Sequence, residues 1–386
     1  MNKELNVVYI GSPTFPNGFA MTKRWRYMVD HMNANGIQSH VLVCHHKIDG
    51  TFTNPEKGKY GLADYRDIRK LFVQKKWLSF YREGKRCLKE WYNDDNDVNN
   101  ILIFSTTLSL VLAPFFRYAK SIGYKVVFDQ VETNMLLGGK MRLKRRINLT
   151  ISNWITKYAH KQADSFVISS ALWRQNHEKY PRMRLCLLPN ATVDLQKSPK
   201  KSLHTPLKVV YSGTFADKDG VSYLIDGAIE ARQKGCNLEL LLAGKGQPWN
   251  MKVLDKLKGC AWAKYLGFIS DEDLMSLIQN GDVLCMTRNN STFANFGFPF
   301  KLSEYLATGN ILLATRVGDV EKYVTDKKDA FVIDPESAHQ IADALCYIAS
   351  HKDEAVEIAQ RGHETMKREF SIENVGKIFV NFLSSL

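Results

Sequence analysis

The chain has 386 residues, enough for two domains of ordinary size, and its 45% hydrophobic and 24% charged residues are typical of a soluble globular protein. Its longest apolar stretch, Ile101 to Phe116, is too short to cross a bilayer, and the first residues lack the features of a secretion signal. Seven scattered cysteines without a CxxC pair favour reduced core thiols in a cytosolic compartment over a disulfide framework or a zinc site.

The net charge of +13 is distributed unevenly along the chain. Met1 to Leu195 contain 30 Lys and Arg against 16 Asp and Glu, whereas the remaining residues contain 23 and 24. The first half therefore carries the whole positive excess. This indicates an anionic partner for that half, which could be membrane phospholipid, a phosphorylated substrate or nucleic acid.

In the first half, apolar runs alternate with amphipathic stretches. A helix is expected over residues 20–34, and strands are expected over 5–10, 39–44, 100–104, 125–128 and 165–168. Such alternation is typical of a parallel sheet covered by helices on both faces. The polar segment 195–202 then interrupts the pattern and is the expected interdomain linker.

The alternation begins again after this linker and continues to long helical patterns beyond His339. Strands are expected over 207–211, 238–243, 283–286 and 311–315, with helices over 221–233, 271–280 and 300–307. The predicted fold class is therefore α/β, with two Rossmann-like domains facing each other across a cleft. Because ligands bind at the carboxyl ends of parallel strands, the cleft is the expected active site.

Two glycine turns follow strands of the second half. Gly213 ends the first strand and lets the backbone approach a ligand, while the amides of the following turn can hold phosphate beside Lys218. The second turn contains Gly244 and Gly246 and lacks the full GxGxxG spacing of a dinucleotide site. Each turn by itself is equally compatible with an ordinary strand-helix connection.

A more specific element is the loop and helix from Gly297 to Gly309. Lys301 and Glu304 are three residues apart, so they lie on one face of the helix near its amino end. A cation at this position can neutralise a diphosphate, and a carboxylate can accept hydrogen bonds from ribose hydroxyls. The alternative is a surface Lys-Glu pair that caps a helix.

Together these segments resemble the retaining glycosyltransferases of family 4, also called group 1, which have the GT-B fold. The resemblance covers nearly the whole chain and is firmest between Lys208 and Tyr347. Its quoted elements are, in order, Ser212-Gly213-Thr214, Leu242-Ala243-Gly244-Lys245-Gly246, Tyr265-Leu266-Gly267-Phe268, Pro299 to Gly309, Gly318-Asp319-Val320-Glu321 and Phe331-Val332-Ile333-Asp334.

The resemblance implies donor-binding residues in the second half. These are Gly213, Thr214, Gly244, Phe268, Asn295, Phe298 and Glu304, with Lys301 and Lys218 as catalytic cations. Glu304 matches the second glutamate of the family's E-x7-E element, whereas the first would fall at Phe296, so Asn295 and backbone amides near Phe298 are candidates to hold the donor sugar. The family's phosphate-binding arginine is replaced by Thr214 and its lysine by Asp219, so that Lys301 is expected to carry more of the diphosphate charge.

The first half matches the family more loosely. Asn17-Gly18-Phe19 resembles its amino-terminal glycine loop, and Gly18, Lys23 and Glu132 are expected on the acceptor side. The family's first-domain histidine has no clear equivalent, and Asp129 and Glu132 occupy its region, with Asp129 as the catalytic candidate. The expected domains are 1–195 for acceptor binding, 203–365 for the nucleotide-sugar, and a helix over 366–386 that returns to the first domain.

The mechanism that the resemblance implies requires neither a metal nor a cofactor. The nucleoside diphosphate leaves while the acceptor hydroxyl attacks the same face of the sugar, and the enzyme stabilises the negative charge that develops on the phosphates. Asp95-Asn96-Asp97 does spell a metal-binding DxD, but it lies in a polar run that favours a solvated loop. No metal is therefore expected at the site.

Two basic stretches of the first half are interleaved with aromatic residues, namely 75–92 and 139–154. Such a pattern suits an interfacial helix on anionic lipid, and the alternative is an ordinary solvated helix face. The expected partners are thus a nucleotide-sugar donor, a glycan or lipid-linked acceptor and an anionic membrane surface, at the cytoplasmic face of the cell membrane.

Two other functions are compatible with parts of the pattern. A nucleotide-sugar epimerase of the same fold should show more acidic and histidine groups near the site. A non-enzymatic protein that binds anionic membranes or nucleic acid would explain the charge, but no nucleic-acid-binding module is recognisable, so no nucleic acid is expected as a partner. The preferred hypothesis is a glycosyltransferase of cell-surface polysaccharide or glycolipid synthesis.

Overall fold

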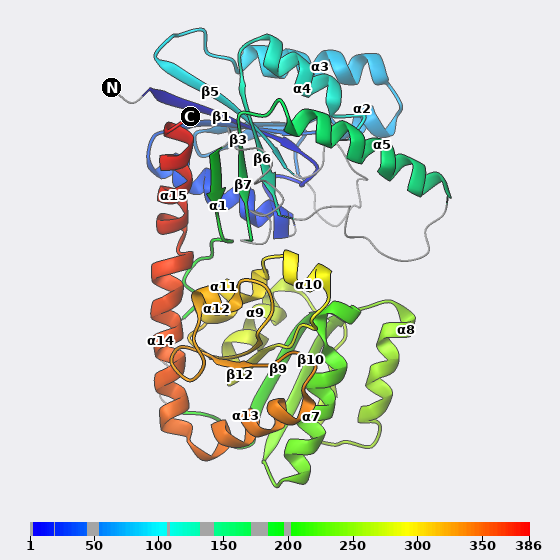
Figure 1. Cartoon of the computed structure of the whole chain (residues 1–386), viewed down its shortest axis with the longest axis vertical. Coiled ribbons are helices and arrows are strands. Elements are labelled where there is room, and N and C mark those ends of the chain that lie inside the picture. Colours follow the sequence, from blue (N-terminus) through cyan, green and yellow to red (C-terminus); the bar gives the residue numbers. More distant parts are fainter. Residues whose placement is uncertain are drawn as a thin grey trace. The chain divides into compact units, whose positions relative to one another are not determined.

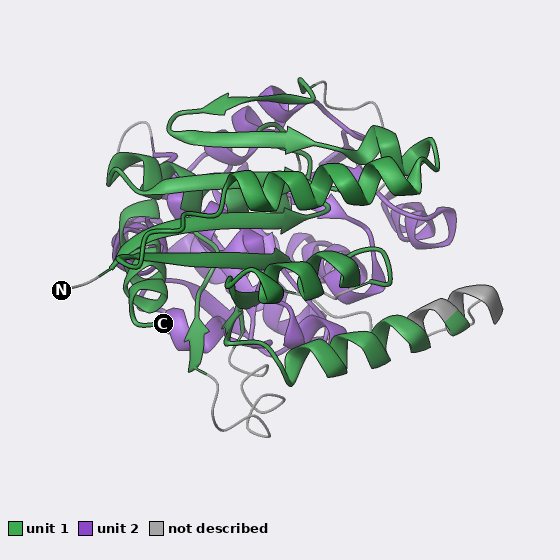
Figure 2. Ribbon diagram, turned by 90° about the horizontal axis from the view of Figure 1, so that it is seen from above, with its two compact units in different colours: residues 1–191, 372–386 green, residues 192–371 purple. Residues whose placement is uncertain are grey.

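The computed structural model describes residues 3–18, 20–44, 54–105, 109–131, 143–170, 184–196 and 202–386. It divides the chain into two compact units, one formed by residues 1–191 with 372–386 and the other by residues 192–371 (Figures 1 and 2). The expected boundaries were 195 and 366, so the second unit extends a few residues beyond them at both ends.

The first unit is built on an eight-stranded sheet of order β3-β4-β2-β1-β5-β6-β7-β8, in which only the β3–β4 pair is antiparallel. Its strands are β1 (Glu4–Gly11), β2 (Gln38–Val43), β3 (Lys57–Tyr60), β4 (Ala63–Asp67), β5 (Val98–Ser105), β6 (Lys125–Gln130), β7 (Ser165–Ile168) and β8 (Arg184–Leu187). The central strands are apolar runs buried on both faces, as a parallel sheet between helical layers requires.

The helices of the first unit cover this sheet. They are α1 (Ala20–Ala34), α2 (Arg69–Val73), α3 (Trp77–Glu90), α4 (Ala113–Ser121), α5 (Leu143–His160) and α15 (Ile372–Ser384). The last of these comes from the end of the chain and packs on α1, where a side chain at Gly376 would meet the ring of His31 at 2.1 Å. Val375, Phe379 and Leu383 complete the apolar core of this unit, and Phe379 stacks on Tyr9.

The second unit contains a six-stranded parallel sheet of order β11-β10-β9-β12-β13-β14. Its strands are β9 (Leu207–Thr214), β10 (Leu238–Lys245), β11 (Ala263–Tyr265), β12 (Val283–Met286), β13 (Ile311–Thr315) and β14 (Phe331–Ile333). The strand order reverses between β9 and β12, and the carboxyl ends at such a switch point form the usual ligand crevice of an open α/β sheet.

In the second unit, the three helices expected over 221–233, 271–280 and 300–307 are found with these bounds, and further helices accompany them. The helices of this unit are α7 (Val221–Gln233), α8 (Pro248–Met251), α9 (Asp271–Asn280), α10 (Thr292–Phe296), α11 (Phe300–Ala307), α12 (Val320–Tyr323), α13 (Ala338–Ser350) and α14 (Lys352–Phe370), with short 3-10 segments η2 (Asp217–Asp219) and η3 (Lys252–Leu257). The fold class predicted from the sequence, α/β with two Rossmann-like domains, is confirmed.

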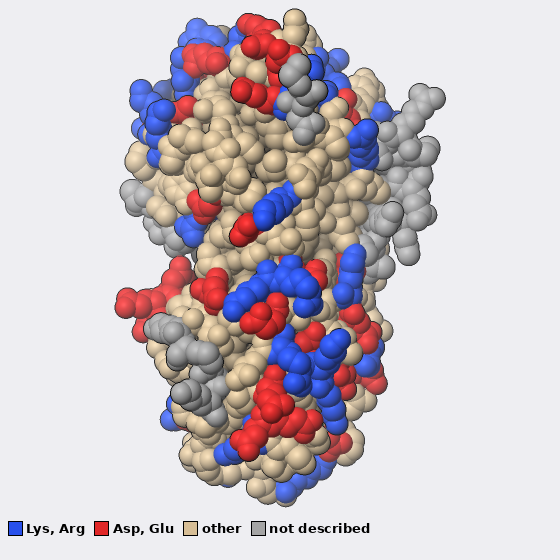
Figure 3. Space-filling view, turned by 90° about the vertical axis from the view of Figure 1, so that its left-hand side faces the viewer, with Lys and Arg blue, Asp and Glu red and all other residues tan. Residues whose placement is uncertain are grey.

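The two units differ in charge. The first contains 31 Lys and Arg against 16 Asp and Glu, a balance of +15, while the second contains 22 against 24, a balance of −2. Lys, Arg, Asp and Glu interleave over the face of the second unit that Figure 3 draws in its lower part. The positive excess therefore belongs to the first unit, and the anionic partner that the sequence predicts stays a prediction for that unit.

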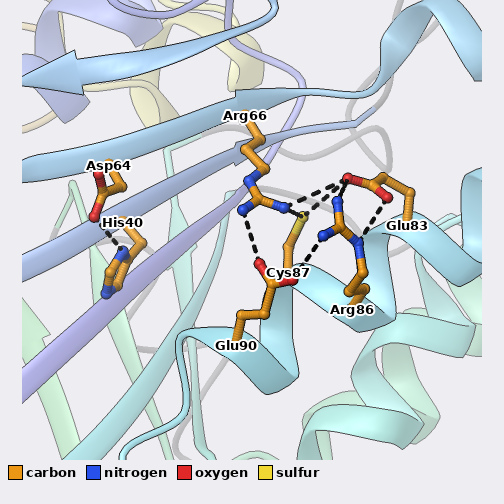
Figure 4. A network of polar contacts seen from close by, with 7 residues as sticks. All are labelled: His40, Asp64, Arg66, Glu83, Arg86, Cys87 and Glu90. Atoms are coloured by element: carbon orange, nitrogen blue, oxygen red, sulfur yellow. Dashed lines mark hydrogen bonds and ion pairs between the residues drawn. The ribbon is translucent and has the colours of Figure 1, made fainter.

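A polar network fixes α3 to the sheet of the first unit (Figure 4). Arg66 on β4 donates to Glu90 at 2.7 Å and lies 5.7 Å from the ring of Trp91. On the other side, the ring of His40 stacks on Trp91 at 4.8 Å and lies 3.8 Å from Asp64. Burial lowers the pKa of His40 to about 4, against the attraction of Asp64, so the imidazole is neutral at neutral pH.

The network predicts a pH-dependent stability of the first unit. Because the pKa of His40 is about 4 in the folded chain and about 6.5 when unfolded, the unfolded state binds the extra proton first as the pH falls. Stability from this group is fully present above pH 6.5 and is lost between pH 6.5 and 4, by about 2 kcal/mol at pH 5. Urea denaturation of the wild type and of His40→Asn at pH 7 and pH 5 measures the difference; equal losses in both would contradict it.

Candidate active site

The candidate site lies at the carboxyl end of β9 in the second unit. The strand ends on Gly213 and Thr214, and Gly213 has a φ of 147°, a conformation that side chains rarely adopt. A Cβ at Gly213 would lie 2.5 Å from Nζ of Lys301, and one at Gly244 would lie 1.8 Å from the carbonyl oxygen of Gly213. The positive φ therefore favours glycine at position 213, and the close approach of the Gly213 backbone requires glycine at position 244.

Lys301 stands at the start of α11, immediately after Pro299 ends the preceding loop. Its Nζ lies 4.2 Å over the ring of Tyr211, a cation–π contact, and within the described part of the chain its ammonium has no hydrogen bond or ion pair. Burial lowers the pKa of Lys301 to about 8; Asp219 raises it, and the charges of Lys218 and Arg288 lower it further. A cation in this position is stabilised by an anionic ligand.

Lys218 and Asp219 belong to the turn between β9 and α7. Asp219 is buried and accepts a hydrogen bond of 2.5 Å from Oγ1 of Thr214, while Nζ of Lys218 lies 3.8 Å from its other oxygen and 5.2 Å from the ring of Phe293. The expected phosphate-binding group Lys218 is thus placed beside the Gly213 turn. Thr214, in contrast, uses its hydroxyl to fix the turn.

Arg288 is a further cation of this site that the sequence interpretation missed. It follows β12, on the other side of the switch point, and is buried, with Nη1 donating to the carbonyl of Gly297 at 2.8 Å. Its charge acts on Lys301. The signal that could have found it is positional: an arginine directly after the strand that adjoins β9 at the switch point.

Other predicted donor-binding residues take different places. Glu304 lies one turn after Lys301 on α11, where its charge raises the pKa of that lysine. Asn295 is engaged in the protein itself, because it donates to Asn290 at 2.9 Å and accepts from the backbone of Gly318 at 3.0 Å. Phe298 packs its ring in the core, so only its backbone can face a ligand.

Phe268 lies on the surface, 68% exposed, in the segment that follows β11. Nζ of Lys245, at the end of β10, lies 4.3 Å from the centre of its ring. The backbone N–H of Gly244 donates to the carbonyl of Gly267 at 2.7 Å, which ties this segment to the end of β10. The aromatic ring is therefore held near the second glycine turn and is accessible to a ligand.

The remaining predicted residues belong to the first unit. Both carboxylate oxygens of Asp129, at the end of β6, accept from Arg24 at 2.9 Å, and Arg24 also donates to Asn190 at 2.7 Å. Asp129 is thus a buried partner of an arginine. This pairing joins residues 105 positions apart and could not be read from the sequence.

The acceptor-side residues are only partly described. Gly18 lies against Thr22, whose hydroxyl would be 2.2 Å from a Cβ at that position, and Lys23 is half-buried on α1. Glu132 lies outside the described residues. Asp95 and Asp97 are exposed in the turn before β5, where Asp95 accepts from the backbone of Asp97.

The fold defines a class of protein: the two units, each built on a largely parallel sheet, are those of the GT-B fold. HepE of Anabaena, solved in complex with UDP, superposes with a TM-score of 0.70 at 12% identity over 99% of this chain and 100% of that one. Sucrose-phosphate synthase of Thermosynechococcus elongatus gives 0.69 at 12% identity over the whole of both chains.

The sequence comparison finds a family match within the second unit. Residues 206–351 match the family described as glycosyl transferases group 1, so the resemblance found in the sequence is confirmed there. D-inositol 3-phosphate glycosyltransferase of Corynebacterium urealyticum is 30% identical over 115 residues, which are 30% of this chain and 26% of that protein. The putative colanic acid biosynthesis glycosyltransferase WcaL of Escherichia coli is 19% identical over 236 residues, 58% of each. The chain thus spans between about a quarter and three fifths of these relatives.

The Arg24–Asp129 pair predicts a structural effect in the first unit. Asp129→Asn leaves the buried guanidinium of Arg24 without its counter-charge, which should lower the free energy of unfolding by about 3 kcal/mol. The exposed Asp95→Asn is the control and should change it by less than about 0.5 kcal/mol. Urea denaturation at pH 7 measures both, and equal stability of the two variants would refute the structural role.

Proposed function

We propose that the chain is a glycosyltransferase that moves a sugar from a nucleoside-diphosphate donor to a glycan or lipid-linked acceptor, in cell-surface polysaccharide or glycolipid synthesis. The observation that carries the proposal is the ammonium of Lys301, held against Gly213 without an ion pair in the described chain and next to Lys218 and Arg288. Three cations at a switch-point crevice suit the paired phosphates of a leaving nucleoside diphosphate.

The similar proteins support the donor and acceptor classes. HepE was solved with UDP and with UDP-glucose, and both structures share the fold of this chain. Curated relatives include the WcaL protein named above and the lipopolysaccharide core biosynthesis glycosyltransferase LpsE of Rhizobium meliloti, 24% identical over 177 residues. A uridine diphosphate sugar is therefore the first donor to test, with guanosine and adenosine diphosphates beside it.

The proposed mechanism retains the configuration of the sugar and uses no metal. Lys301 and Lys218 stabilise the charge on the departing diphosphate, Arg288 adds a positive potential, and Glu304 accepts hydrogen bonds from the ribose. The acceptor hydroxyl attacks from the face that the diphosphate leaves. Turnover should persist in EDTA, and NMR of the first product should show the anomeric configuration of the donor; inversion or a strict metal requirement would contradict this part.

The proposal extends to a location at the cytoplasmic face of the cell membrane, as a peripheral protein. Its support is the +15 balance of the first unit, which would face a lipid-linked acceptor. Among the described helices, none is long and apolar enough to cross a bilayer.

Removal of the cation at position 301 should weaken the enzyme strongly. A charge-assisted contact contributes about 1.5–3 kcal/mol, so Lys301→Met should lower kcat/KM about ten- to a hundredfold. The fold should be retained, because the ammonium has no ion pair to lose within the described chain. The exposed Lys258→Met, which removes a surface ion pair with Asp255, is the control and should leave turnover unchanged. Equal kinetics of the two variants would refute the site.

The lowered pKa of Lys301 predicts the pH dependence of donor binding. The pKa is about 8 in the free chain, so the site is charged below pH 8 and loses its cation above it. The dissociation constant for the nucleoside diphosphate should rise about tenfold from pH 7 to pH 9, in inverse proportion to the fraction of Lys301 that is protonated. Lys301→Arg stays protonated and should flatten the profile. A wild-type dissociation constant that is the same at pH 7 and pH 9 by calorimetry would be the contrary result.

A further inference from the structure

Helix α5 of the first unit presents its apolar side chains to solvent. Ile147, Ile151, Trp154 and Tyr158 are spaced by four, three and four residues, so they form one stripe along the helix. Their exposed fractions are 50, 37, 71 and 52%. Large apolar groups gathered on one exposed face mark a surface that contacts a membrane, another protein or a ligand.

The opposite face of α5 is small and polar where it packs on the sheet. Thr156, Ala159 and His160 are buried, and the ring of His160 contacts Phe128 at 4.7 Å and Phe166 at 4.9 Å. The helix is thus anchored at its carboxyl end, and Figures 1 and 2 show it extending away from the sheet from there. Its pattern is inverted relative to a helix that buries its apolar face in a core.

The sequence that contains the stripe carries charge of one sign. Between Glu132 and Asp164 the sequence contains seven Lys and Arg and no Asp or Glu. Lys157 on α5 and Lys161 just after it are exposed and lie beside the stripe by helical spacing. Trp154 and Tyr158 lie with ring centres 6.5 Å apart, and these are the two residue types that prefer the boundary between lipid headgroups and hydrocarbon.

We propose that α5 seats the chain on an anionic lipid bilayer, with Ile147, Ile151, Trp154 and Tyr158 inserted below the headgroups and Lys157 and Lys161 at the phosphates. This inference rests on the membrane location in the proposed function and names the surface responsible. The match between an acid-free basic segment and an apolar stripe selects anionic lipid over a second protein copy, since two such segments would repel one another.

The test is co-sedimentation of the full chain with phosphatidylcholine vesicles that contain 30 mol% phosphatidylglycerol. The wild type should bind these vesicles and leave pure phosphatidylcholine vesicles largely free. The double variant Ile151→Ser with Trp154→Ser should lower the partition coefficient at least tenfold at low salt. The double variant Lys157→Gln with Lys161→Gln should lower it several-fold and reduce its sensitivity to salt.

The control is Leu78→Ser, which removes an apolar side chain that is even more exposed, at 82%, at the start of α3 in the other basic stretch. It should bind vesicles as the wild type does. If Leu78→Ser lowers vesicle binding and the stripe variant does not, the membrane contact lies at the start of α3 and the inference is overturned. The inference is also overturned if the wild type does not bind anionic vesicles. The same holds if sedimentation velocity shows a wild-type dimer that the stripe variant does not form.

A parallel thermal-shift measurement with UDP separates this inference from the proposed function. The stripe variants should keep the wild-type response to nucleotide, because α5 belongs to the other unit. Loss of vesicle binding with an intact nucleotide response supports the inference. Intact vesicle binding with no response to any nucleoside diphosphate would leave the membrane seat standing and reject the transferase.

Discussion

The site depends on the contact between Lys301 and Gly213, the glycine near the end of β9. Gly213 and Gly244 let β9, β10 and the ammonium of Lys301 approach within distances that any Cβ would prevent. The ring of Tyr211 contacts the ammonium of Lys301. The carboxylate of Asp219 accepts a hydrogen bond from Thr214, and the carboxylate of Glu304 belongs to the next turn of α11. The resulting positive potential is preorganised, which suits the diphosphate of the proposed donor.

Much of this site followed from local sequence patterns. The strand ending on Gly213, the helix over 300–307 and the common face of Lys301 and Glu304 are set by neighbouring residues, and the structure has them at the predicted places. The second unit was the easier half because its strands are uniform apolar runs separated by clear helical repeats. In the first unit, β3 and β4 were missed, since Lys57–Tyr60 is a short polar strand at an edge of the sheet.

What the sequence could not reveal are partners distant along the chain. Arg288 joins the site only because β12 lies next to β9, and Asp129 loses both oxygens to Arg24 on a helix 105 residues earlier. Asn295 and Phe298 also have partners that are distant along the chain. The amide oxygen of Asn295 accepts a hydrogen bond from the backbone of Gly318, and the ring of Phe298 packs in the core. Residue type and spacing identify candidates, and the topology of the sheet decides which of them remain accessible to a ligand.

The crossing of the chain from α14 to α15 has a consequence for how the protein is made. Residues 192–371 form the second unit as one continuous segment, whereas the first unit needs α15, whose Val375, Phe379 and Leu383 fill its core. On the ribosome, the unit that is synthesised second can therefore finish folding before the one that is synthesised first. Until residues 372–384 emerge, the apolar side chains of α1 and β1 that α15 covers stay exposed to solvent.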